Sequence, residues 1–343
     1  MTGRRLELTR DQILRHRRRV GALDRRLPFG PDSLRTAAWA GLQDSMPRAA
    51  LLSIHARLDD TRPDALDDPT LVQVWGPRFS AFVVAALDAP IFTLGRFPDD
   101  ARGRRVAMDT AERLDAFLAG RRMGYGDAGD AMGVNANSLR YATTTGRVLV
   151  RWEGARQPII WTVPAPETSA AEARLELARR HLHVFGPTTA AAFAKWAGIG
   201  PREAGGAFEA LAAELVPVAT PVGGRSILAS DEPSFRDPGH PAAAARLLPS
   251  GDAFFLLHGA DRDLLVPDAD RAATLWTSRV WPGAVLVDGE VAGTWRRAGA
   301  DVTVEPWRRF SPMERQAIET EAASMPLPNL PRSIGVRWGP LAT

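Results

Sequence analysis

The chain has 343 residues, of which 45% are hydrophobic and 24% charged, as in a globular protein of about two to three domains. Cysteine is absent, which excludes thiolate catalysis, cysteine-ligated zinc, iron–sulfur clusters and disulfides. The formal net charge is +3, and Lys195 is the only lysine among the 43 lysines and arginines.

Positive charge is concentrated at the start of the chain, where residues 1–35 hold ten arginines and four acidic residues. The arginines are Arg4, Arg5, Arg10, Arg15, Arg17, Arg18, Arg19, Arg25, Arg26 and Arg35. This excess predicts a phosphate-facing patch, and the alternative is an ordinary solvated helix face. Residues 1–5 lack the apolar core of a signal peptide, and no run of about 18 apolar residues predicts a membrane span. We therefore expect a cytoplasmic protein with no membrane partner.

The first hundred residues predict three helices and two apolar segments. Thr9 caps the first helix, and Pro47 pushes Met46 toward extended backbone before the third. The apolar segments fit helix or strand equally well. The predicted helices are 10–23, 33–42 and 47–58, and the apolar segments are 71–75 and 79–87.

A helix–turn–helix followed by a β-hairpin is predicted twice in the middle of the chain. The first copy has helices 125–132 and 137–142 and strands 147–152 and 158–163, joined by a turn at 153–156. The second has helices 170–184, 188–196 and 201–213 and strands 215–220 and 225–229, joined across Gly223 and Gly224. This order is typical of winged helices, and the residues before 100 are a candidate third copy.

The C-terminal part changes character after a Pro- and Gly-rich stretch at 231–241. Asp288 and Gly289 lie between two alternating apolar segments, which is a strong hairpin signal. A third strand follows at 301–306, and Ser311 caps a closing helix over 311–324. The complete pattern predicts an α+β fold of tandem winged-helix modules followed by a C-terminal β-hairpin or small sheet and a closing helix. The predicted domains are 1–103, 104–166, 167–232 and 233–343.

Familiar catalytic motifs are missing from the sequence. It contains no phosphate-binding glycine loop and no G-x-S-x-G nucleophile elbow. His181 and His183 form the only close histidine pair, and two helical residues at that spacing face apart, so we expect no metal site. His55 lies on an apolar stripe, where a core histidine is favoured over a catalytic base.

Four stretches resemble the AlkZ-like winged-helix DNA glycosylases, a family associated with resistance to DNA-crosslinking antibiotics. They are residues 40–45, Arg78, residues 246–252 and residues 281–297, of which the last is the most specific. The resemblance spans roughly residues 8–325.

The resemblance implies tandem winged helices curved into a C around double-stranded DNA. It also implies a monofunctional DNA N-glycosylase that releases N7-alkylated guanine, including crosslinked guanine. Alkylation at N7 makes the base cationic and a good leaving group, so the enzyme has to place a water and stabilise a cationic sugar. No cofactor is expected, and we expect a monomer associated with the nucleoid.

In the family, a glutamine and a glutamine or aspartate two residues later hold the water between them. The matching residues here are Gln43, Asp44 and Ser45, and Ser45 departs from the pattern. In extended backbone, Gln43 and Ser45 face one side and Asp44 the other. Asp44 would supply a carboxylate only from a bent loop, and the alternative is that Asp44 or Ser45 caps the following helix.

Further residues are predicted to contact DNA. The resemblance implies that the hairpin at Asp288 and Gly289 approaches the minor groove, with Arg296 and Arg297 at its base. The alternative is a purely structural hairpin. The winged-helix copies offer side chains suited to phosphate and groove contacts. Together with Arg78, these are Asn137, Arg140, Arg147, Arg151 and Arg202.

Two functions from different classes follow from these observations. The first is a DNA glycosylase, and the second is a non-catalytic winged-helix DNA-binding protein, such as a regulator or lesion binder. A hydrolase acting on another N-glycoside is a third. Gln43 and Ser45 are the residues that discriminate between catalysis and binding alone.

Overall fold

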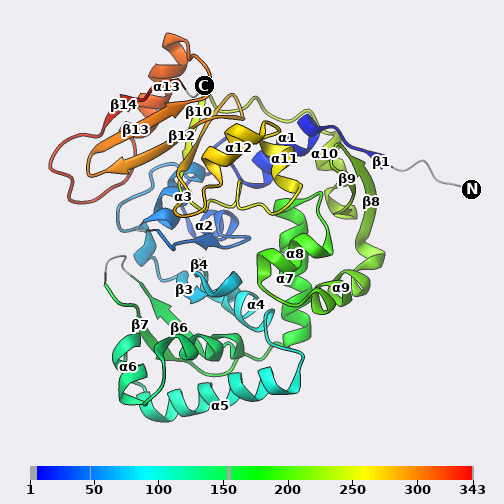
Figure 1. The fold of residues 1–343 in the computed structure, drawn as a ribbon, viewed down its shortest axis with the longest axis vertical. Helices are drawn as coiled ribbons and strands as arrows, with labels where there is room; N and C mark the ends of the chain where they lie inside the picture. The colour runs from blue at the N-terminus through cyan, green and yellow to red at the C-terminus, as the bar shows by residue number, and fades with distance from the viewer. Residues whose placement is uncertain (1–5, 47, 153–155, 342–343) are drawn as a thin grey trace, which may run out of the picture.

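The computed structural model describes residues 6–46, 48–152 and 156–341, and it combines helices with three sheets in these residues (Figure 1). Arg4, Arg5, Pro47 and most of the predicted turn at 153–156 lie outside the described residues. A five-stranded sheet with one covering helix lies at one end of the molecule, and the long helix α5 lies at the other (Figure 1). The mixed α+β class predicted from the sequence is therefore confirmed.

The N-terminal segment contains α1 (Arg10–Val20), α2 (Pro31–Ala37) and α3 (Ala49–Arg57). Thr9 and Gln12 form a capping box at the start of α1, as the sequence predicted. The prediction for the second helix was wrong at its end, because α2 stops at Ala37 and the short strand β2 (Leu42–Gln43) follows. Gly41 has a φ of +73°, and a Cβ there would lie 2.9 Å from the Phe82 ring, so the turn into β2 requires glycine.

A six-stranded sheet joins the first and second segments. Its strand order is β2-β4-β3-β6-β7-β5, so both ambiguous apolar segments contain strands. Gln73 of β3 pairs with Val150 of β6, which makes the two segments parts of one sheet. The strands besides β2 are β3 (Leu71–Trp75), β4 (Ala81–Ala85), β5 (Met123–Gly124), β6 (Val148–Arg151) and β7 (Ile159–Thr162).

One face of this second segment is covered by a helix that the sequence analysis missed. α5 (Ala101–Leu118) is rich in arginine, but it buries a stripe at helical spacing, from Ala107 and Ala111 to Leu114 and Leu118. The other helices are α4 (Ala89–Leu94), α6 (Tyr125–Ala131) and a 3-10 helix over Ala136–Thr145. The predicted second helix of the first copy is therefore a 3-10 helix rather than an α-helix.

The third segment has the predicted helices and hairpin. Its elements are α7 (Ala170–Phe185), α8 (Ala190–Ala197), α9 (Pro201–Ala210), β8 (Leu215–Thr220) and β9 (Gly223–Leu228), with β1 (Leu6–Glu7) paired to β8. The predicted turn was displaced, because Thr220 pairs with Gly223 and leaves Pro221 and Val222 as the loop. The Thr220 hydroxyl donates to the Gly223 carbonyl and fixes this register.

The C-terminal segment contains the predicted hairpin and closing helix. Asp288 and Gly289 connect β11 to β12, and Ser311 and Glu314 form a capping box at the closing helix. The sheet has the order β10-β11-β12-β13-β14. Its strands are β10 (Ala245–Leu248), β11 (Gly283–Val287), β12 (Glu290–Ala298), β13 (Asp301–Pro306) and β14 (Gly335–Trp338). The helices of this segment are α10 (Glu232–Arg236), α11 (Asp261–Leu265), α12 (Ala269–Leu275) and α13 (Pro312–Ala323).

The N-terminal arginines bind other parts of the protein, in place of the predicted phosphate-facing patch. Arg17 is buried and donates to the backbone carbonyls of Phe185 and Gly186. Most of the other arginines form ion pairs, so their charges are neutralised within the fold. The pairs are Arg10–Glu290, Arg15–Asp11, Arg18–Asp24, Arg19–Asp237, Arg26–Glu321 and Arg35–Asp88.

The largest core cluster ties the segments together. It contains Phe82 of β4, Leu182 of α7, Trp196 of α8 and Phe255 of the segment after β10. Phe82 of this core pairs with Gln43 of β2, so the core supports the strand that ends at Gln43. In the parts of the chain that the structure covers, no helix has both the length and the apolar character needed to cross a membrane.

Candidate active site and nucleic-acid interface

Gln43 and Ser45 lie on the same side of the chain where β2 ends. The Gln43 Nε2 atom donates to the Ser45 Oγ atom at 3.2 Å, and both residues are partly exposed, although the Gln43 Oε1 atom is buried with no hydrogen-bond partner among the described residues. The Asp44 N–H between them donates to the Ala81 carbonyl of β4 at 2.8 Å. The backbone is therefore held by the sheet, and the two side chains share one face, as extended backbone predicts.

Asp44 faces the opposite side and is buried. Its Oδ1 accepts from the Ala50 N–H at 3.1 Å, and its Oδ2 accepts from Gln73 Nε2 at 2.8 Å. Burial raises the pKa of Asp44 to about 7, against the lowering effects of the Ala50 hydrogen bond and the charges of Arg151 and Arg48. Asp44 thus bonds the first turn of α3, which is the capping alternative considered for it.

Gln73 extends this buried network to the next strand. Its Oε1 accepts from the Trp152 N–H at 2.6 Å, just after β6 ends. The Gln43 loop is therefore connected through Asp44 and Gln73 to the hairpin of the second segment. A glutamine in the middle of an apolar strand is the only sequence signal that would have pointed to this link.

A tight turn after β10 packs against Gln43. Gly251 has a φ of +77°, and a Cβ there would lie 2.9 Å from Gln43 Oε1, so the turn reaches the side chain only with glycine. Asp252 anchors the turn through hydrogen bonds to both Arg57 terminal nitrogens, at 2.7 and 2.8 Å, and to the Ser53 hydroxyl at 2.7 Å. The segment 246–252 thus contributes directly to the position of Gln43.

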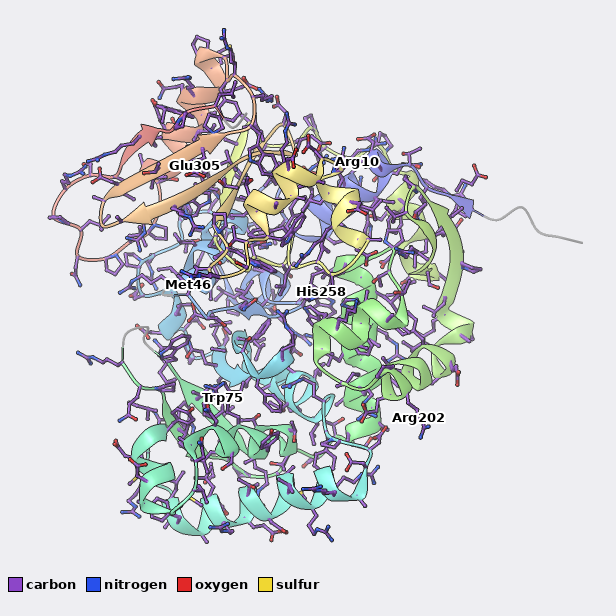
Figure 2. All side chains as sticks on the ribbon, viewed as in Figure 1. Arg10, Met46, Trp75, Arg202, His258 and Glu305 are labelled. Atoms are coloured by element: carbon purple, nitrogen blue, oxygen red, sulfur yellow. The ribbon has the colours of Figure 1, made fainter. Side chains whose placement is uncertain are left out.

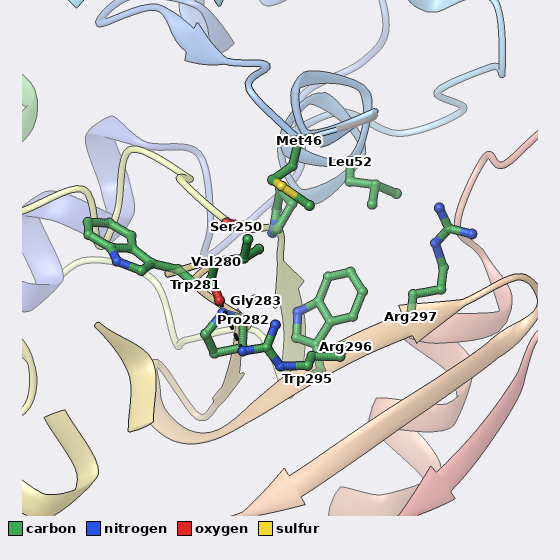
Figure 3. Close-up of a pocket in the computed structure, with 12 residues that line it drawn as sticks. Met46, Leu52, Ser250, Val280, Trp281, Pro282, Gly283, Trp295, Arg296 and Arg297 are labelled. Atoms are coloured by element: carbon green, nitrogen blue, oxygen red, sulfur yellow. Dashed lines mark hydrogen bonds between the residues drawn. The ribbon is translucent and has the colours of Figure 1, made fainter. Parts of the chain in front are cut away.

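Next to this turn is a pocket of about 330 Å³ with aromatic walls and a cationic rim (Figure 3). Trp295 is fixed by a hydrogen bond to the Leu248 carbonyl, and Trp281 by one to the Thr277 carbonyl. The pocket borders the Gln43 loop, because its lining includes the residues that directly follow Ser45 and precede Gly251. The lining residues are Met46, Ala49, Leu52, Pro249, Ser250, Val280, Trp281, Pro282, Gly283, Trp295, Arg296 and Arg297.

The rim of the pocket is positively charged. Burial and then the charge of Arg48 lower the pKa of Arg297, so two cations approach each other here. In the described chain, Arg296 and Arg297 form no ion pair, and each donates to a backbone carbonyl instead. This arrangement favours an anionic ligand at the mouth of the pocket.

The tip of the β11–β12 hairpin lies elsewhere. The Gly289 carbonyl accepts from Arg18 Nη1 at 3.2 Å, and a Cβ at Gly289 would lie 2.6 Å from the Arg18 guanidinium. Asp288 is exposed beside it, and the following Glu290 pairs with Arg10. The structure thus separates the predicted hairpin tip, which packs on α1, from Arg296 and Arg297, which line the pocket.

The remaining residues predicted to contact DNA are spread over the second and third segments. Arg147 pairs with Asp115, and Arg151 pairs with Asp67. The Arg140 guanidinium lies 5.6 Å from the ring centroids of both Trp75 and Tyr125, and the Tyr125 hydroxyl donates to Asn137. Arg202 is exposed in the first turn of α9, at the outer edge of the molecule (Figure 2). The structure does not bring these residues together with Gln43.

Arg78 lies between the candidate site and the third segment. It has a φ of +54° in the turn between β3 and β4, and its Nη1 donates to His258 Nε2 at 3.3 Å. His258 lies near the centre of the view, and Met46 lies to its left (Figure 2). The sequence analysis did not identify His258, because nothing near it in sequence marks its position.

His55, His181 and His183 have structural roles. His55 is buried, bonds Ser324, and has its pKa lowered to about 3 by burial and the charges of Arg26 and Arg246. His181 is buried among aromatic rings, whereas His183 bonds Asp231, so this pair faces apart as predicted. Within the described ranges, no group of histidine and acidic side chains could hold a metal ion.

The site therefore offers a carboxamide whose Oε1 atom is buried and unpartnered among the described residues, a hydroxyl, aromatic walls and a cationic rim. A carboxamide both donates and accepts hydrogen bonds, so it can orient a water molecule without taking its proton. Such a site suits hydrolysis of a bond whose leaving group needs no acid.

Comparison with known proteins identifies a family and a shared fold. The family model described as DNA glycosylase AlkZ-like matches residues 36–326. A search of curated proteins gives no significant match. Among solved structures, the DNA glycosylase AlkZ of Streptomyces sahachiroi is similar, with 16% sequence identity and a TM-score of 0.77 over 97% of this chain and 100% of that one. At this identity, the structural match shows a shared fold.

Proposed function

Because the chain belongs to the AlkZ-like DNA glycosylase family, we propose that it releases N7-alkylated guanine, including crosslinked guanine, by hydrolysing the N-glycosidic bond. The proposed partner is double-stranded DNA of the nucleoid, and the proposed active form is a monomer. The observation that carries the proposal is the Gln43 carboxamide, held beside Ser45 in the loop whose next residue, Met46, lines an aromatic, cation-rimmed pocket.

The chemistry needs little from the protein. When the C1′–N9 bond breaks, the electron pair moves to N9 and the cationic alkylated guanine leaves as a neutral base, so no general acid is required. A water adds to C1′ and releases its proton to solvent, because a carboxamide is not a base. Gln43 orients this water, and Ser45 orients Gln43, which is the form of catalysis that depends on positioning.

The pocket suits the alkylated base that leaves in this reaction. The faces of Trp281 and Trp295 offer negative quadrupoles that favour a cationic base. Arg296 and Arg297 at the rim attract the flanking phosphates rather than the base. Asp44 acts indirectly in this proposal, since both of its oxygens bond the protein framework.

The two repeated helix–hairpin segments complete the proposal. The order of α6, the 3-10 helix and β6–β7, and of α8, α9 and β8–β9, fits winged helices that grip the duplex in a curved arrangement. Asn137, Arg140 and Arg202 are then the groove and phosphate contacts furthest from the lesion. Asp288 and Gly289 are left out of this surface because their turn packs on α1.

The test is base release from a duplex that carries a single 7-methylguanine. The wild-type protein should release the base, and Gln43→Ala should lower the single-turnover rate about 100-fold or more. Ser45→Ala should cost about tenfold, because it removes one neutral hydrogen bond. Gln316→Ala, the same change on the exposed face of α13, is the matched control and should keep the wild-type rate.

A non-catalytic DNA-binding protein is the second candidate. It is favoured by Ser45, which has neither a carboxylate nor an amide, and by the burial of Asp44. Salt-dependent duplex binding with no release of 7-methylguanine or of a crosslinked base would support this candidate and refute the glycosylase.

A further inference from the structure

Four basic side chains from four different elements face one point beside the candidate active site. Arg78 belongs to the β3–β4 turn, Lys195 to α8, His258 to the segment before α11, and Arg262 to α11. The Arg78 guanidinium bonds His258, and the charges of Arg78, Arg262 and Lys195 all act on the His258 ring. These residues lie far apart in the sequence, so the fold assembles the cluster.

The cluster differs from the arginines of α1 because no acid neutralises it. In the portion of the chain that the structure describes, Arg78, Lys195 and Arg262 form no ion pair, and Arg78 Nε is buried with no hydrogen-bond partner. His181 of α7 also faces His258 and is held neutral by burial, with a pKa of about 3. Three positive charges close together without a carboxylate form an anion-binding surface.

Aromatic and backbone contacts hold the cations in place. The Arg262 guanidinium lies 4.9 Å from the ring centroid of Trp276 and 5.3 Å from that of Trp281, and its Nε donates to the Leu257 carbonyl. Arg78 is wedged against the turn after α8, where a Cβ at Gly198 would lie 3.0 Å from the Arg78 backbone. A preorganised site of this kind loses less entropy when it binds a ligand.

The cluster shares a wall with the pocket at Gln43. Trp281 both lies 5.3 Å from the Arg262 guanidinium and lines the pocket. A nucleotide matches this layout of a pocket next to a basic cluster, since its base can enter a pocket while its phosphate stays outside among cations.

We infer that Arg78, Lys195, His258 and Arg262 bind one phosphodiester group of the DNA strand whose base occupies the pocket at Gln43. This inference rests on the proposed function for the identity of the ligand, and it assigns a specific phosphate to residues that the family resemblance did not supply beyond Arg78. A bound phosphate would accept from both guanidiniums and the Lys195 ammonium.

His258 reports on the occupancy of the site. Its pKa is lowered to about 4 by burial and then by Arg78, Arg262 and Lys195, so the ring is neutral at pH 7. An anion placed among these cations offsets their effect on the ring and raises this pKa. Titration of His258 by NMR with and without a lesion-free duplex should therefore show a higher pKa in the complex, with inorganic phosphate as the small-anion probe.

The decisive experiment combines protein variants with neutralised DNA. Binding of a lesion-free duplex is measured against salt for wild type, Lys195→Gln and Arg262→Gln, with Arg113→Gln on the exposed face of α5 as the matched control. Lys195→Gln and Arg262→Gln should each weaken binding about tenfold and reduce the salt slope by about 1, and Arg113→Gln should change neither.

A methylphosphonate scan, which removes the charge of one linkage at a time, then identifies the phosphate. In wild type, one linkage should weaken binding about tenfold when neutralised, and in Arg262→Gln the same replacement should weaken binding clearly less, because one of its partners is already gone. Three results would each overturn the inference. They are additive losses of affinity at every linkage, a salt slope that is unchanged in the variants, and a His258 pKa that rises with inorganic phosphate but not with DNA. These binding measurements do not depend on base release, which is tested separately. Binding at this site by a protein that releases no base would refute the glycosylase alone, and base release together with unaffected binding by the variants would refute this site alone.

Discussion

Two basic regions of this protein use the same kind of side chain for opposite purposes. The arginines of α1 are dense in the sequence, yet ion pairs and backbone carbonyls engage most of them. The cations around His258 are scattered over the sequence and meet no carboxylate in the described residues. The comparison teaches that the partners of a basic residue, and not the local density of charge, decide whether it stabilises the fold or remains available to a ligand.

The largest expected effect tests the structural half of this comparison. Arg18→Ala leaves the Asp24 carboxylate without its partner, and both side chains are only 8% exposed. Breaking a buried pair in this way should lower the free energy of unfolding by about 3–5 kcal/mol, as measured by urea denaturation. Duplex affinity of the folded variant should stay within about twofold of wild type, and a large loss of affinity with intact stability would break the comparison.

The second effect concerns Asp44, the acid of the candidate site. Burial raises the pKa of Asp44 to about 7 in the folded protein. As the pH rises from about 4, Asp44 loses its proton in the unfolded chain but keeps it in the folded protein, so the free energy of unfolding falls until about pH 7. Over this range the free energy of unfolding should fall by about 2–4 kcal/mol in the wild type, and Asp44→Asn should not show this fall. Denaturation at several pH values measures the difference, and parallel pH profiles would contradict the burial of this carboxyl group.

Gln73→Leu should produce the third effect. It leaves the Asp44 Oδ2 atom and the Trp152 N–H without their hydrogen bonds, which should cost about 1–3 kcal/mol of stability. Base release should slow through kcat more than through KM, because the Gln43 loop loses its anchor while the DNA contacts remain. Gln316→Leu on α13 is the control for the substitution, and equal losses in both variants would show that Gln73 has no special position.

The smallest expected effect tests whether the acid that pairs with Arg10 is what keeps this arginine away from DNA. Glu290→Gln removes the acid that faces Arg10, in a pair that is 32% and 50% exposed, so stability should change by less than about 1 kcal/mol. DNA affinity should stay within about twofold, because Arg10 still donates to the Leu264 and Leu265 carbonyls. A tenfold gain in affinity would mean that Glu290 alone withholds Arg10 from DNA.

Local signals were sufficient where neighbouring residues determine the structure. Both capping boxes, at Thr9 and at Ser311, and the hairpin turn at Asp288 were predicted because hydrogen bonds within a few residues define them. The end of α2 was mispredicted because the turn at Gly41 depends on two phenylalanine rings from other elements. α5 was missed because only its narrow apolar stripe, and not its composition, marks it as a packed helix.

The candidate site shows the same division. The common face of Gln43 and Ser45 and the capping role of Asp44 follow from extended backbone and a nearby helix start. The partners Gln73 and Gly251 could not be predicted, because each comes from a distant segment and touches the loop only through the tertiary fold. The sequence therefore pointed to Gln43 as the candidate side chain but not to the residues that hold it.

The pairing of Gln73 with Val150 limits how this protein can be divided or redesigned. A cut near residue 103 would leave β3 and β6 as open edges, and exposed strand edges recruit other chains into aggregates. A graft of the second segment onto another scaffold would therefore have to bring a substitute neighbour for β6. Gene fusions and split reporters are better inserted in the exposed connection around Gly239, where no strand pairing is interrupted.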